Sequence, residues 1–89
     1  MNKEEIEQML ISVVRELQEL SGREMAEISV GTRPTEDIPG FDSLNCVEAT
    51  IDAASRLGKE VNFNNVFFVD NKSLTIQEAA ARLLGEIQK

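Results

Sequence analysis

The chain has 89 residues, the size of one small domain, so we expect a single domain spanning residues 1–89. Its composition, 42% hydrophobic and 28% charged, is typical of globular proteins, and the absence of histidine excludes imidazole as a general base or metal ligand. With 9 basic and 16 acidic residues the net charge is −7, which disfavours binding to nucleic acid or to anionic membranes and favours basic surfaces on protein partners.

The first predicted element is an amphipathic helix that ends at Leu20. Its apolar residues recur at the spacing of one helix face, and acidic residues fill the opposite face. The apolar positions are Ile6, Met9, Leu10, Val13, Val14, Leu17 and Leu20. Ser21 and Gly22 supply the stop signal.

A long connection follows, over residues 23–42. Glycine and proline at positions 31, 34, 39 and 40 predict irregular chain from 31 to 40, and the sequence leaves open whether residues 23–30 are helical. Connections this long are usually functional or are anchored by a few apolar side chains. The candidate anchors are Ile28, Val30, Ile38 and Phe41.

A second long helix is predicted to begin at Asp42 or Ser43, with Asp42 as its N-cap, and to end at Gly58. Apolar residues again recur at helical spacing. The expected buried stripe is Leu44, Val47, Ile51, Ala54 and Leu57.

Residues 61–70 are rich in aromatic and β-branched side chains, which favours a strand. Since a lone strand would have no partner, we expect a short helical turn at residues 65–70 instead. The last helix has a clear start, because Thr75 and Glu78 match the capping-box pattern and Leu74 is placed to pack on Ala79. Its expected inner face is Ile76, Ala79, Ala80, Leu83, Leu84 and Ile87.

These elements predict an all-α fold, a small bundle of three long helices and one short helix. The single cysteine cannot form an internal disulfide, and no apolar stretch approaches the ~20 residues of a membrane-spanning helix. The first residues lack the basic start and apolar run of a signal peptide. We therefore expect a cytoplasmic protein that does not bind membranes.

One position in the sequence carries a specific chemical signal, Ser43. Its hydroxyl lies at a predicted helix start just after a glycine-containing loop, where unpaired N–H groups and the helix dipole favour a phosphoester. We expect Leu44 to anchor the first turn in the core, so that Ser43 faces outward. The plainer interpretation is that Ser43 belongs to an ordinary loop-to-helix junction. No metal-ligand cluster or phosphate-binding loop is present in the sequence.

The segment from Gly40 to Leu44, Gly-Phe-Asp-Ser-Leu, resembles the Gly-x-Asp-Ser-Leu signature of acyl carrier proteins. The resemblance covers nearly all of the chain: an acidic first helix, a long loop, a helix that begins at the motif serine, a short third element and a final helix. It implies an acyl-carrier-like bundle in which Ser43 carries 4′-phosphopantetheine derived from coenzyme A, flanked by Asp42 and Leu44 of the motif.

The resemblance also implies a carrier and not an enzyme. A separate phosphopantetheinyl transferase would modify the serine, and acyl-loading and acyl-transfer enzymes would act on acyl groups held as thioesters on the arm. The expected state is a monomer. In the family, Lys and Arg side chains of the enzymes contact acidic side chains of the motif helix, which here points to Asp42, Glu48 and Asp52. The expected lining of an acyl cavity is Leu44, Val47, Ile51, Phe67, Ile76 and Ala80.

The sequence departs from the family pattern in its charge. Asn45 directly follows the motif, Arg56 and Lys59 lie near the end of the helix, and 10 of the acidic residues fall in positions 1–42. A specialised lipid or polyketide-like pathway is therefore an alternative to fatty-acid synthesis. The competing class of function is an acidic helical interaction module with the same fold and an unmodified Ser43.

Two further features have open interpretations. Cys46 is either a reactive thiol near the arm or a small packed helix residue. Of Phe67 and Phe68, one is expected in the core, and the other is either core as well or an exposed contact or gate.

Overall fold

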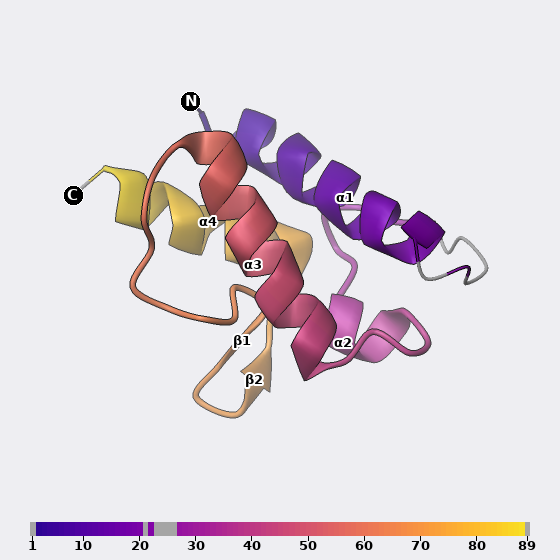
Figure 1. Ribbon diagram of the computed structural model, residues 1–89. Coiled ribbons are helices and arrows are strands. Elements are labelled where there is room, and N and C mark those ends of the chain that lie inside the picture. The colour runs from indigo at the N-terminus through magenta and orange to yellow at the C-terminus, as the bar shows by residue number, and fades with distance from the viewer. Residues whose placement is uncertain (1, 21, 23–26, 89) are drawn as a thin grey trace.

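The computed structural model describes residues 2–20, 22 and 27–88 (Figure 1). The elements are α1 (Lys3–Leu20), α2 (Pro34–Asp37), α3 (Ser43–Leu57), β1 (Phe68–Val69), β2 (Lys72–Ser73) and α4 (Ile76–Ile87). Helix α1 packs against both α3 and α4, while α2 and the two strands lie near the start of α3. The predicted small helical bundle is confirmed. None of the described helices has an apolar run long enough to cross a membrane.

Each of the three long helices begins at a reciprocal capping box, in which two side chains three residues apart each accept the other's backbone N–H. The pairs are Asn2 with Glu5, Asp42 with Asn45, and Thr75 with Glu78. The predicted N-caps at Asp42 and Thr75 are thus confirmed. The predicted end of α3 is also confirmed, since Gly58 adopts a left-handed conformation (φ 67°) that glycine reaches without strain.

The core lies between α1, α3 and α4, and the predicted inner faces of α1 and α4 largely form it. Leu20 is an exception, since it lies at the end of α1 and is 84% exposed. Leu84 and Ile87 are half-buried at the margin of the core. The fully buried apolar residues of α1 and α4 are Ile6, Leu10, Val13, Val14, Ile76, Ala79, Ala80 and Leu83.

Helix α3 buries its predicted stripe only in part: Val47, Ala54 and Leu57 are half-buried, and Leu57 packs against the core. Leu44 and Ile51 are each 65% exposed, so the expectation that Leu44 anchors the first turn in the core was wrong. The buried residues are Cys46, Ala49, Thr50 and Ala53. This stripe has the same helical spacing as the predicted one but consists of small side chains, which let α3 approach α1 closely. Periodicity alone does not distinguish two stripes on one helix.

The segment after α3 contains a strand ribbon, so the predicted helical turn at residues 65–70 was wrong. β1 and β2 pair antiparallel, with Phe68 opposite Ser73, and the strand partner is therefore the next segment of the chain. Asp70 and Asn71 form the two-residue turn with positive φ angles of 51° and 63°. Asp and Asn are the residues other than glycine that adopt this conformation most readily, which explains the reversal.

The connection before α3 is more ordered than predicted. Pro34 is the first residue of α2, a position that suits proline because an N–H is not needed there. The expectation of irregular chain over residues 31–40 was therefore wrong in part. Of the four expected anchors, Ile28, Ile38 and Phe41 are buried, and Val30 is 38% exposed.

The connection between α1 and α2 is hydrogen-bonded to the start of α4. Ile76 N–H donates to the Thr32 carbonyl and Gln77 N–H donates to the Val30 carbonyl, each at 2.9 Å. Residues 27–30 are not helical, and residues 23–26, for which the sequence left a helix open, lie outside the described residues.

A buried hydroxyl in the middle of α3 fixes the segment that follows the helix. Thr50 Oγ1 donates to the Cys46 carbonyl at 2.7 Å and accepts from Val66 N–H at 2.8 Å. Val66 and Phe67, held there, are fully buried in the core. Because Thr50 is only 2% exposed, water does not compete for these bonds.

We expect Thr50→Val to lower the free energy of unfolding by about 1–3 kcal/mol, because the Val66 N–H is then buried without an acceptor. Thr50→Ser keeps the hydroxyl and serves as the matched control. Urea denaturation measures the stability, and amide hydrogen exchange measures protection at Val66. A valine variant with the stability and the Val66 protection of the parent would contradict this role.

Candidate functional site

Ser43 is the first residue of α3, and its side chain is exposed. The preceding Asp42 does not project freely, because its carboxylate accepts from Asn45 N–H at 3.1 Å and its own N–H donates to Asn45 Oδ1 at 3.3 Å. This capping box fixes the backbone on both sides of the serine. The hydroxyl is therefore presented to solvent from a well-defined position.

The start of α3 offers unpaired amides beside that hydroxyl. Within the described part of the chain, the N–H groups of Ser43 and Leu44 donate to no acceptor. In α4 the corresponding amides of Ile76 and Gln77 are used by the long connection. Free N–H groups and the positive end of the helix dipole stabilise an anionic group, so the start of α3 is chemically suited to a phosphate ester.

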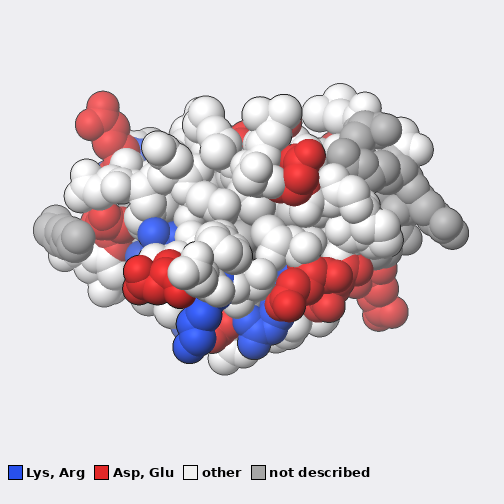
Figure 2. Space-filling view, turned by 90° about the horizontal axis from the view of Figure 1, so that it is seen from below, with Lys and Arg blue, Asp and Glu red and all other residues white. Residues whose placement is uncertain are grey.

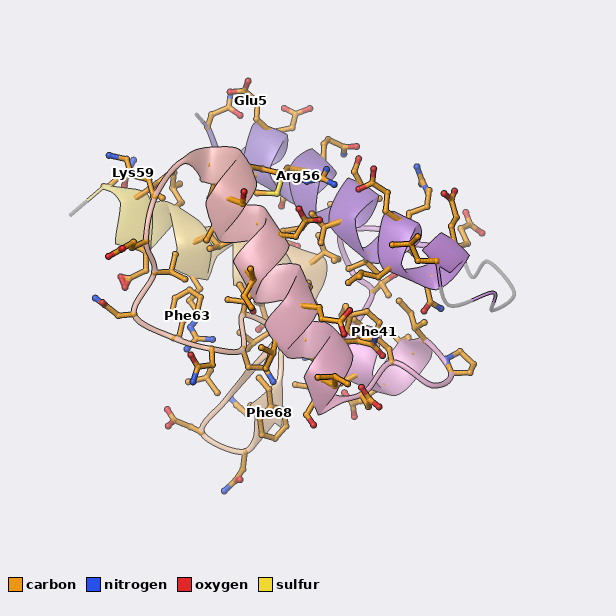
Figure 3. All side chains as sticks on the ribbon, viewed as in Figure 1. Glu5, Phe41, Arg56, Lys59, Phe63 and Phe68 are labelled. Carbon is orange, nitrogen blue, oxygen red and sulfur yellow. The ribbon has the colours of Figure 1, made fainter. Side chains whose placement is uncertain are left out.

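Two hollows flank α3. A small pocket of about 270 Å³ adjoins Ser43, and its walls are Thr35, Phe41, Asp42, Ser43, Asn65 and Phe68. A larger open groove of about 530 Å³ runs beside the later turns of α3, lined by apolar residues that include Val47, Ile51, Ala54, Val61 and Phe63. Figure 3 shows Phe41 and Phe68 near the first turn of α3, and Phe63 on the loop beside the later turns.

The six residues expected to line an acyl cavity do not lie together. Val47 and Ile51 line the larger groove. Phe67, Ile76 and Ala80 are fully buried in the core. Leu44 lines neither hollow and is exposed.

The three acidic residues expected to bind partners differ in availability. Asp42 is occupied by the cap of α3. Asp52 pairs with Arg56 at 3.2 Å, and Arg56 also pairs with Glu16 of α1. Glu48 is exposed and pairs with no other described residue. On the face seen from below, carboxylates form several separate clusters, and Lys and Arg side chains lie beside those in the lower half of the view (Figure 2).

Cys46 is a packed core residue, as its plainer interpretation predicted. Its side chain is fully buried. Burial raises the pKa of the thiol to about 11, although a hydrogen bond with the Asn65 side chain opposes the shift. Since the thiolate is the nucleophile, this protonated thiol is poorly reactive at neutral pH.

The two adjacent phenylalanines face opposite ways. Phe67 is fully buried and meets Phe41 edge to face, with ring centroids 6.1 Å apart. Phe68 is 41% exposed and forms a wall of the pocket beside Ser43. The prediction of one core ring is confirmed.

Sequence reasoning missed Thr35 and Asn65 as neighbours of Ser43. Each lies in a different segment, and only the tertiary fold brings them to the pocket. No local pattern around either residue signals this position.

Comparison of the chain with models of known protein families, with curated proteins and with solved structures finds no match.

The raised pKa of Cys46 predicts a loss of stability at high pH. Between pH 9.0 and about 11 the unfolded thiol ionises while the folded thiol stays protonated, so the unfolded state is increasingly favoured, by up to roughly 3 kcal/mol. We expect the stability of Cys46→Ala to fall less steeply over this range. Urea denaturation at several pH values compares the two proteins. Parallel pH profiles would contradict the assignment.

Proposed function

We propose that the protein is an acyl carrier protein that holds acyl intermediates as thioesters on a 4′-phosphopantetheine arm attached to Ser43. The pathway is of the fatty-acid type or a specialised lipid or polyketide-like type. The observation that carries the proposal is the exposed hydroxyl of Ser43 at the start of α3, beside two amides that donate to no described residue. The Gly-x-Asp-Ser-Leu pattern and the helical bundle are in accord with it.

The attachment would proceed as a phosphoryl transfer from coenzyme A. Ser43 Oγ forms a bond to the phosphorus that carries pantetheine, and the pyrophosphate bond of coenzyme A breaks. Adenosine 3′,5′-bisphosphate leaves, and the transferase removes the hydroxyl proton. The phosphodiester product carries a negative charge, which the amides of Ser43 and Leu44 and the dipole of α3 stabilise.

The protein in this role delivers substrate and performs no reaction of its own. The arm presents its terminal thiol to loading and transfer enzymes, and tethering raises the effective concentration of the acyl group at their sites. Exposed apolar side chains and an exposed carboxylate on α3 give such enzymes a surface to contact. These residues are Leu44, Glu48 and Ile51.

The alternative is a non-catalytic interaction module with an unmodified Ser43. The specific observation in its favour is the 65% exposure of both Leu44 and Ile51, because exposed large apolar side chains on one helix mark a docking surface whether or not the serine is modified. Modification of Ser43 separates the two functions.

Incubation with coenzyme A and a broad-specificity phosphopantetheinyl transferase should add one phosphopantetheine to the parent and none to Ser43→Ala. Ser55→Ala, which removes another exposed hydroxyl from α3, is the matched control and should be modified like the parent. Intact-protein mass spectrometry gives the result. A folded parent that several transferases leave unmodified would favour the interaction module.

Glu48→Lys should slow modification of Ser43 at low salt, because transferases with basic docking surfaces then meet a positive charge on α3. The difference from the parent should shrink as salt is added. Glu4→Lys makes the same change in net charge on α1 and is the control. Initial rates with the same transferase measure the effect. Equal rates for Glu48→Lys and parent at low salt would exclude this surface.

A further inference from the structure

The pocket beside Ser43 is built from three separate parts of the chain. Phe41, Asp42 and Ser43 come from the junction before α3, Thr35 comes from α2, and Asn65 and Phe68 come from the segment after α3. Its volume of about 270 Å³ is about half that of the groove beside the later turns of α3, which is about 530 Å³. The pocket therefore suits a short chemical group better than a long acyl chain.

Phe68 forms one wall of the pocket, and hydrogen bonds of its strand partner, Ser73, hold that wall in place. Ser73, the strand partner of Phe68, is tied to α2, because Thr35 Oγ1 donates to Ser73 Oγ at 2.6 Å and Arg33 donates to the Ser73 carbonyl. On the opposite wall, the Phe41 ring packs edge to face against Phe67. Both aromatic walls are thus fixed without a ligand, so an occupant would not have to order them.

Three of the polar side chains that line the pocket are already hydrogen-bonded. The hydroxyl of Thr35 is bonded to Ser73, Asn65 Oδ1 accepts from Phe67 N–H at 2.9 Å, and Asp42 caps α3. What remains available to a ligand is mainly apolar ring surface, above all Phe68, which is 41% exposed. The pocket therefore suits a compact apolar group close to Ser43.

We propose that this pocket holds the first part of the phosphopantetheine arm, with the two methyl groups of its pantoyl unit against the ring of Phe68. The inference rests on the proposed function, since it requires the arm on Ser43. The dimethyl carbon lies only a few bonds beyond the phosphate, so an arm attached to Ser43 places it beside its own attachment site. Phe68 is a positioning residue, which restrains the base of the arm and leaves its thiol end free.

The test uses the full chain, modified with coenzyme A that carries ¹³C in the pantoyl methyl groups. Mass spectrometry first establishes the modification. In the modified parent we expect nuclear Overhauser contacts between these methyls and the Phe68 ring, and an upfield ring-current shift relative to free coenzyme A. Methyl signals at the positions seen in free coenzyme A, without contacts to Phe68, would overturn the inference while leaving the proposed function intact.

Variants separate a specific contact from a general effect. Phe68→Ala should abolish the upfield shift, and Phe68→Leu should abolish the shift but keep contacts between the methyls and the leucine side chain. Phe63→Ala removes a ring from the larger groove and should leave the shift unchanged. A shift that persists in Phe68→Ala would overturn the inference. Failure to modify Ser43 in the folded parent would overturn both proposals, which distinguishes the two results.

Discussion

The hydroxyl of Thr50 is the constraint on which the candidate site depends. It joins the middle of α3 to Val66, next to a second link in which the Cys46 thiol is hydrogen-bonded to the Asn65 side chain. With Val66 and Phe67 held in the core, the extended chain that follows turns the next side chain to the opposite side. Phe68 thereby faces Ser43, although the fixing bond lies about two helical turns away along α3.

The small residues on the buried face of α3 differ from the residues on its outer surface. Cys46, Ala49 and Ala53 are small enough to pack against α1, and Leu57 near the end of the helix packs partly buried against the core. Leu44 and Ile51, by contrast, are exposed. Small side chains thus form much of the buried face of α3, and two of its large apolar side chains lie on the outer surface.

The elements fixed by neighbouring residues were the ones that sequence reasoning predicted. The caps at Asp42 and Thr75 and the end at Gly58 depend on side chains within one turn, and all three were found. The buried face of α3 was found only in part, because two stripes of equal period compete and only packing against α1 selects one. The ribbon after α3 was missed because each of its strands has only two residues, too few to show the alternating pattern of a strand.

Only the local part of the candidate site could be predicted from the sequence. The position of Ser43 at the start of a helix is local and was correct. The pocket beside it joins residues 35, 41–43, 65 and 68, and its polar ties run from α2 to β2. Such an arrangement exists only after the chain has folded, so no spacing in the sequence reports it.

The bonds from Val30 and Thr32 to the first amides of α4 bear on how the chain folds. They close a loop of more than forty residues that contains α2, α3 and the ribbon. Doubling the length of a flexible loop adds only about 0.6 kcal/mol to the entropic cost of closing it, so these two bonds hold a long stretch of the chain at a modest cost. Every residue that lines the pocket beside Ser43 lies between the two ends of this loop, so the bonds at the start of α4 enclose the whole candidate site.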